Sequence, residues 1–139
     1  MASGANPSLA ATPERGKLTE VRDGLLRLHK VLLDWERIRY ERTNGRIDDL
    51  MQLLHLTIND PSFAWLRGLS TLVVEMDERM EDKKKPLAPD DVTALRDEAR
   101  ALLTPSQTGN DFQRNYYYAL QETPDIVVAH AAMLKLLKG

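Results

Sequence analysis

The sequence predicts an all-α fold, an antiparallel bundle of five or six helices. Apolar residues recur at steps of three and four through most of the chain, and this spacing places them on one face of a helix. No segment shows the alternation of apolar and polar residues that is typical of a half-buried strand. Prolines and short polar stretches interrupt the helical pattern, so several helices are expected rather than one long rod.

The longest predicted helix covers residues 18–40 and extends in both directions to clear end signals. Thr12 and Pro13 are typical of a helix start, and Gly45 is typical of a helix end. Its apolar residues form a stripe of Leu18, Val21, Leu25, Leu28, Leu32 and Trp35, and a second line of Leu26, Leu33 and Tyr40. This sector is wider than one partner helix requires, so we expect the helix to be central.

Five further helices are predicted, at about residues 46–59, 61–82, 89–103, 111–121 and from Pro124 onward. Prolines mark several of the starts, because the first helical position needs no N–H donor. The first and third helices should be the long central members. The predicted inward face of the second helix consists of Ile47, Leu50, Met51, Leu54 and Ile58. That of the third consists of Phe63, Leu66, Leu69, Val73, Met76 and Met80, widened by Trp65 and Leu72.

The chain of 139 residues is predicted to form one domain over residues 13–139, after a disordered N-terminal tail of residues 1–12. No apolar run approaches the roughly 20 residues that a membrane span needs, so no membrane association is expected. The absence of cysteine excludes disulfides and thiolate metal sites. We therefore expect a cytoplasmic protein.

The common catalytic and nucleotide-binding motifs are absent from the sequence. It contains no GxxxxGK[ST], GxGxxG, GxSxG or HExxH, and none of its three histidines follows a glutamate by three residues. These observations argue against the enzyme classes that such motifs define. They favour a non-catalytic protein, although they leave other kinds of enzyme open.

A cluster of arginines and aromatic residues at the end of the first helix could bind another molecule. Nucleic acid is a poor candidate, because Glu36 and Glu41 dilute the positive charge and the sequence pI is about 5.9. A run of three tyrosines covers much of another helix, so at least one ring should face outward. The predicted interaction surface comprises Trp35, Arg39, Tyr40, Tyr117 and Tyr118.

His29 and His130 lie in the middle of apolar faces on the first and last helices. The favoured interpretation is that both are neutral, hydrogen-bonded core residues. In the alternative, they share a pocket with Glu36 and Asp77 and hold a divalent metal, the one cofactor that the sequence suggests. The structural interpretation is stronger, because two histidines on separate helices have no ligand spacing of their own.

The sequence therefore predicts a small helical module that works by binding protein, either a partner or a second copy of itself. Self-association is expected because the apolar sector of the first helix, together with Trp65, Leu72 and the tyrosine run, is more than a small bundle needs to bury. The alternative function is a metal- or small-ligand-binding bundle with buried histidines, which could be enzymatic.

Overall fold

The computed structural model describes residues 12–138, and this part of the chain is all-α. It contains six α-helices, one 3₁₀ helix and no strand, which confirms the predicted fold class. The elements are α1 (Pro13–Asn44), α2 (Leu50–Asn59), η1 (Pro61–Leu66), α3 (Arg67–Glu81), α4 (Pro89–Leu102), α5 (Asp111–Glu122) and α6 (Pro124–Leu137). The predicted N-terminal tail lies outside the described residues except for Thr12.

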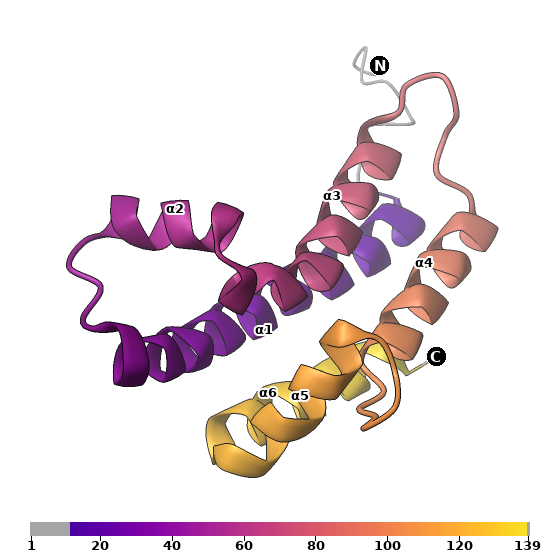
Figure 1. Cartoon of the computed structure of the whole chain (residues 1–139). Coiled ribbons are helices and arrows are strands. Elements are labelled where there is room, and N and C mark those ends of the chain that lie inside the picture. The colour runs from indigo at the N-terminus through magenta and orange to yellow at the C-terminus, as the bar shows by residue number, and fades with distance from the viewer. Residues whose placement is uncertain (1–11, 139) are drawn as a thin grey trace.

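The central element is α1, which contacts η1, α3, α4 and α6 (Figure 1). Its 32 residues give it a length of about 48 Å. At its start Thr12 Oγ1 accepts a hydrogen bond from the Arg15 N–H at 3.1 Å, and at its end Gly45 has a φ of 87°, which favours glycine. The predicted apolar stripe is buried, with exposed fractions between 0% and 7%.

Two neighbours pack closely on α1 from different sides. Gly24 of α1 faces α6, where an added Cβ would lie 2.5 Å from Met133 Sδ and 2.6 Å from Leu136 Cδ1, so the missing side chain lets α6 approach. On the α3 side, Arg22 Nε lies 2.9 Å from Asp77 Oδ1, and Arg22 Nη2 lies 3.2 Å from Asp77 Oδ2. This ion pair fixes the register of α3 on α1.

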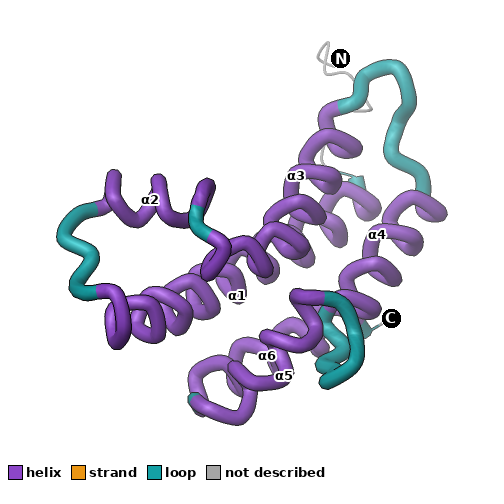
Figure 2. Tube along the Cα trace, in the orientation of Figure 1, coloured by secondary structure: helices purple, strands orange, loops and turns teal. Residues whose placement is uncertain are grey.

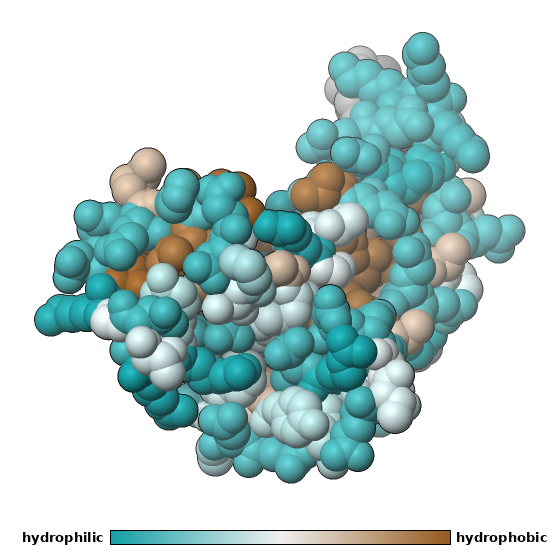
Figure 3. All heavy atoms as spheres, in the orientation of Figure 1, coloured by the Kyte–Doolittle hydropathy of each residue, from teal (hydrophilic) through white to brown (hydrophobic). Residues whose placement is uncertain are grey.

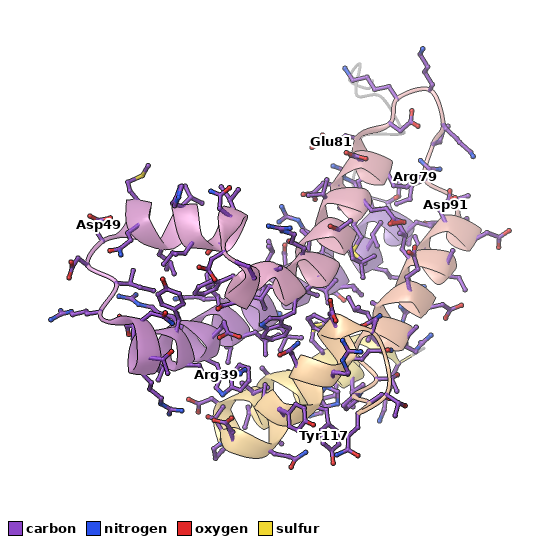
Figure 4. All side chains as sticks on the ribbon, viewed as in Figure 1. Arg39, Asp49, Arg79, Glu81, Asp91 and Tyr117 are labelled. Atoms are coloured by element: carbon purple, nitrogen blue, oxygen red, sulfur yellow. The ribbon has the colours of Figure 1, made fainter. Side chains whose placement is uncertain are left out.

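The loop between α3 and α4 and the α2 helix lie at different ends of the molecule. The loop between α3 and α4 lies at one end of the view, and α2 lies at the other (Figure 2). Arg79 of α3 and Asp91 of α4 point toward one another and form an ion pair beside that loop (Figure 4). None of the helices within residues 12–138 combines the length and apolar character needed to cross a membrane.

The predicted start of the second helix at residue 46 is wrong, because α2 begins at Leu50. Asp49 caps it, with its Oδ1 accepting from the Gln52 N–H at 2.8 Å. Ile47 is 1% exposed although it precedes the helix, and its N–H donates to Glu41 Oε2 at 2.8 Å. Burial of Ile47 therefore holds the connecting segment against the end of α1.

The single helix predicted over residues 61–82 is divided into two elements. Residues Pro61–Leu66 form η1, and α3 follows directly from Arg67. Asp60 Oδ1 accepts from the Ser62 N–H at 2.8 Å and caps η1. The predicted inward residues of this region are buried, with exposed fractions between 0% and 6%; they are Phe63, Leu66, Leu69, Val73, Met76 and Met80. Trp65 and Leu72 are buried as well, at 6% and 5% exposed.

The predicted inward face of the second helix is also wrong for every residue that lies within α2. Leu50, Met51, Leu54 and Ile58 are exposed by 76%, 71%, 49% and 57%. The side that faces the bundle instead carries Leu53, which is 8% exposed. The helix is thus rotated relative to the sequence-based expectation, and its broad apolar face is turned toward solvent.

Candidate functional site

Glu36 is the buried carboxylate of α1, with 5% of its surface exposed. Its Oε1 accepts a hydrogen bond from Trp65 Nε1 at 2.8 Å and lies 3.5 Å from Arg39 Nη1. The Arg39 guanidinium carbon lies 4.5 Å from the ring centroid of Trp35. The rings of Trp35 and Trp65 meet edge to face, with their centroids 6.0 Å apart. A buried carboxylate, one arginine and two indoles therefore form one connected cluster.

Burial raises the pKa of Glu36 above its ordinary value. The hydrogen bond from Trp65 and the charge of Arg39 act in the opposite direction, because both stabilise the carboxylate. Arg39 extends from α1 near α5 (Figure 4). It lines two open hollows of about 330 Å³ each. Both hollows are lined in part by Glu36 and Ser62. The carboxylate therefore has two partners from its own chain, Trp65 and Arg39.

A row of ring contacts leads from this cluster to His130. It runs through Trp35, Trp65, Phe112, Tyr116 and His130, with successive centroids 6.0, 5.5, 5.2 and 5.3 Å apart. Tyr116 Oη lies 2.6 Å from His130 Nδ1, and burial raises the pKa of Tyr116. The phenol is therefore protonated and able to donate its proton to the neutral imidazole. Burial also lowers the pKa of His130.

The predicted set His29, His130, Glu36 and Asp77 has separate partners. Asp77 pairs with Arg22, whereas Glu36 bonds to Trp65 and Arg39. Arg22 and Glu36 are fourteen residues apart, which is about 21 Å along the helix axis. Within residues 12–138, no three histidine, aspartate or glutamate side chains form a group that could hold a metal.

The two histidines face different neighbours. His29 lies on the line of Arg22 and Glu36, which contact α3 and η1. Gly24, which faces α6, is about 140° away from His29 around the helix. His130 of α6 bonds to Tyr116 of α5. His29 is partly buried, and burial lowers its pKa.

The predicted interaction surface is divided between the core and the exterior. Trp35 is 7% exposed and belongs to the core. Tyr40 is partly buried against Phe63, with ring centroids 5.6 Å apart. Tyr118 is 52% exposed, and its ring meets that of the partly buried Tyr117 edge to face at 5.4 Å. The sequence-based surface is therefore not one continuous patch.

Among the helices of residues 12–138, α2 carries the most large apolar side chains that are exposed, namely four. We define the α2 face as Leu50, Met51, Leu54 and Ile58, which lie within a sector of about 100° around the helix. The α2 sequence LMQLLHLTIN contains no charged residue. In the view of Figure 3, apolar atoms appear among polar ones in the region of α2, and a notch separates this region from the upper part of α3. The signal for this face was present in the sequence, because α2 is apolar on almost every side and needs more than one neighbour.

Comparison with known proteins gives no relative, since no family model, curated protein or solved structure matches the chain.

Proposed function

We propose that the protein is a non-catalytic helical module of the cytoplasm that binds another protein chain through the α2 face. The observation that carries this proposal is the exposure of Leu50, Met51, Leu54 and Ile58, which ranges from 49% to 76%. Contiguous exposed apolar side chains mark interaction surfaces, because their contact with water is unfavourable. A partner that covers them gains the hydrophobic free energy that the fold leaves unused.

The composition of α2 also supports docking of a protein. The helix carries no charge, so a partner need not remove charged groups from water. Full burial of one Leu, Ile or Met side chain stabilises by about 1.5–3 kcal/mol. Each of the four exposed side chains can still gain part of this free energy when a partner covers it. A helix laid along the α2 face could contact residues spaced by four, such as Leu50, Leu54 and Ile58.

The alternative of a metal- or ligand-binding bundle has less support. Glu36, Asp77 and His130 each bond to a side chain of the same chain. These contacts satisfy the polar groups that such a site would need. We therefore retain protein binding as the function.

Site-specific photo-crosslinking in cells of the source organism tests the proposal. A photoreactive phenylalanine analogue replaces Leu54 in the α2 face, and a matched control carries it at Glu20, which is exposed on α1. We expect light-dependent adducts at position 54 and not at position 20. Mass spectrometry then identifies the attached chain, whether it is this protein or another.

The result that overturns the proposal is equally specific. If position 54 gives no adduct, or gives the same adducts as position 20, the α2 face does not bind protein under those conditions. The variant should fold normally, because Leu54 is 49% exposed. Circular dichroism of the purified variant checks this.

A further inference from the structure

A second exposed apolar face lies on α6. It consists of Val127, Val128 and Leu134, which are exposed by 47%, 69% and 43%. We call these three residues the α6 face. In contrast to the α2 face, it carries positive charge at its carboxyl end, where the exposed Lys135 lies within its sector and the exposed Lys138 follows.

We propose that the α2 face of one copy of this chain docks on the α6 face of a second copy, in antiparallel orientation. The inference rests on the proposed function, since it names the partner of the α2 face. Neither face can cover the other within one chain, because α2 and α6 lie on opposite sides of α1 (Figure 1).

The charges at the ends of the two helices are complementary in this orientation. Asp48 and Asp49 precede α2, and an antiparallel α6 would place Lys135 and Lys138 beside them. In this orientation the dipoles of the two helices point in opposite directions, which is favourable. Charge pairing of this kind sets orientation more than affinity.

The other ends of the two helices match as well. The side chain of Arg67, the first residue of α3, reaches the carboxyl end of α2, where its guanidinium donates to the Ile58 carbonyl oxygen. Asp125 lies in the first turn of α6, Glu122 is the last residue of α5, and both are exposed. A parallel orientation would instead place Asp49 beside Asp125, so it is disfavoured by repulsion of like charges.

The two faces have similar lengths. Leu50 to Ile58 spans about 12 Å along α2, and Val127 to Leu134 spans about 10 Å along α6, at 1.5 Å per residue. One face can therefore cover the other without leaving a large apolar overhang. The contact of two short helices is smaller than the roughly 1,600 Å² of a standard interface, so association should depend on concentration.

A symmetric pairing of α2 with α2 fits less well. An antiparallel pair of α2 helices would leave both α6 faces uncovered. A pairing of α6 with α6 would leave both α2 faces uncovered. Docking of α2 on α6 covers both kinds of face and repeats from copy to copy, which gives an open chain or a closed ring.

Two variants of the full chain test this arrangement by light scattering coupled to size exclusion. Leu54→Glu places a charge in the α2 face, and Val128→Glu places one in the α6 face. Each should raise the dissociation constant at least about tenfold and behave as a monomer of 15.8 kDa. The control Gln52→Glu adds the same charge to α2 outside its apolar face and should associate like the unchanged protein.

The decisive sample is an equimolar mixture of the two variants. Leu54→Glu retains an intact α6 face and Val128→Glu retains an intact α2 face, so the mixture should form a 1:1 dimer and nothing larger. The unchanged protein should grow beyond a dimer as concentration rises to about 1 mM, a range suited to a small interface.

Several results would overturn the inference. They are a monomeric unchanged protein over the whole range, a dimer of either variant alone, or a mixture that stays monomeric. If position 54 nevertheless crosslinks to a different polypeptide in cells, the proposed function stands and only the identity of the partner is wrong. If position 54 gives no crosslink at all, both proposals fail.

Discussion

Trp65 donates its indole N–H to the carboxylate of Glu36 at 2.8 Å, and both side chains are buried. This hydrogen bond joins η1 to α1 across 29 positions of the chain. A buried hydrogen bond to a charged acceptor contributes more than a neutral one, but the carboxylate also loses its hydration. The stability of the protein should therefore depend on whether Glu36 is ionised.

Glu36→Gln should make the protein more stable relative to the unchanged chain as pH rises. The pKa of Glu36 is raised above 4.5, so the folded state holds this proton more tightly than the unfolded state. Stability contributed by the proton is present below 4.5 and is lost as pH rises through the raised pKa. Glutamine keeps an acceptor for Trp65 and carries no charge. Urea unfolding between pH 4 and pH 7 measures the difference.

Two controls separate this charge effect from the hydrogen bond. Glu36→Ala leaves the Trp65 N–H unpaired and should destabilise the protein by about 1–3 kcal/mol at any pH. Trp35→Phe removes an indole N–H that has no hydrogen-bond partner among the described residues. It should cost less than Trp65→Phe. Equal costs for the two tryptophans would contradict the importance of the Glu36 contact.

Gly24 and Gly16 of α1 should respond oppositely to larger residues. A Cβ at Gly24 would meet Met133 and Leu136, so Gly24→Leu overpacks the α1–α6 contact and should cost about 1–3 kcal/mol. Nothing lies within 4 Å of a Cβ at Gly16, so Gly16→Ala should add up to about 1 kcal/mol through helix propensity. Thermal unfolding compares the two. Stabilisation by Gly24→Leu would show that α6 packs elsewhere.

Leu53 and Leu54 are neighbours in sequence, but their contributions to folding should differ sharply. Leu53 is 8% exposed, so Leu53→Ala should cost about 2–4 kcal/mol. Leu54 is 49% exposed, so Leu54→Ala should change the free energy of unfolding by much less, by about 1 kcal/mol or below. Chemical unfolding of dilute, monomeric protein measures both. The reverse order would mean that α2 has the rotation expected from the sequence.

His130 should make the protein less stable in mild acid. Burial lowers the pKa of His130 below 6.5, so below that pH the unfolded state binds a proton that the folded state does not. This part of the stability is complete above 6.5 and is lost as pH falls toward the lowered pKa. His130→Gln should remove it, and the slope between pH 7.5 and pH 5.5 should become flatter. His29 should retain a similar contribution, because its pKa is lowered too.

Tyr116→Phe supplies the matched test of the same contact. It removes the hydroxyl that lies 2.6 Å from His130 Nδ1, and it should cost about 1 kcal/mol. In the absence of the phenol, His130 loses a donor that suits its neutral form, so its contribution to the slope should shrink. An unchanged slope in both variants would contradict this account.

The helices could be predicted from sequence wherever end signals and one clear apolar stripe coincide. The stripe of α1 has a cap at Thr12 and an end at Gly45, and both are found in the structure. The α2 helix lacked this clarity, because apolar residues occur on almost every side of it. The apolar pattern predicted a helix here. Which side of it faces inward depends on the neighbouring elements, and in the structure the buried side is the one that carries Leu53.

For the candidate site, the buried polar residues could be predicted from the sequence, but their partners could not. The line of Arg22, His29 and Glu36 within an apolar sector was visible in the sequence, and it indicated buried polar groups. Their partners were not visible, since Asp77 and Trp65 are 55 and 29 positions away along the chain. Contacts over such separations depend on how the helices pack, which apolar spacing does not specify.

The position of α2 has a consequence for the motions of the chain. It is bounded by the segment 45–49 and by Asp60, and its main contact is with η1. Because Leu53 is its one buried residue, α2 should open more readily than the helices that form the core, once the hydrogen bond from Arg67 of α3 to the Ile58 carbonyl oxygen is broken. Its backbone amides should therefore exchange with deuterated solvent earlier than those of α1, and a bound partner should slow that exchange.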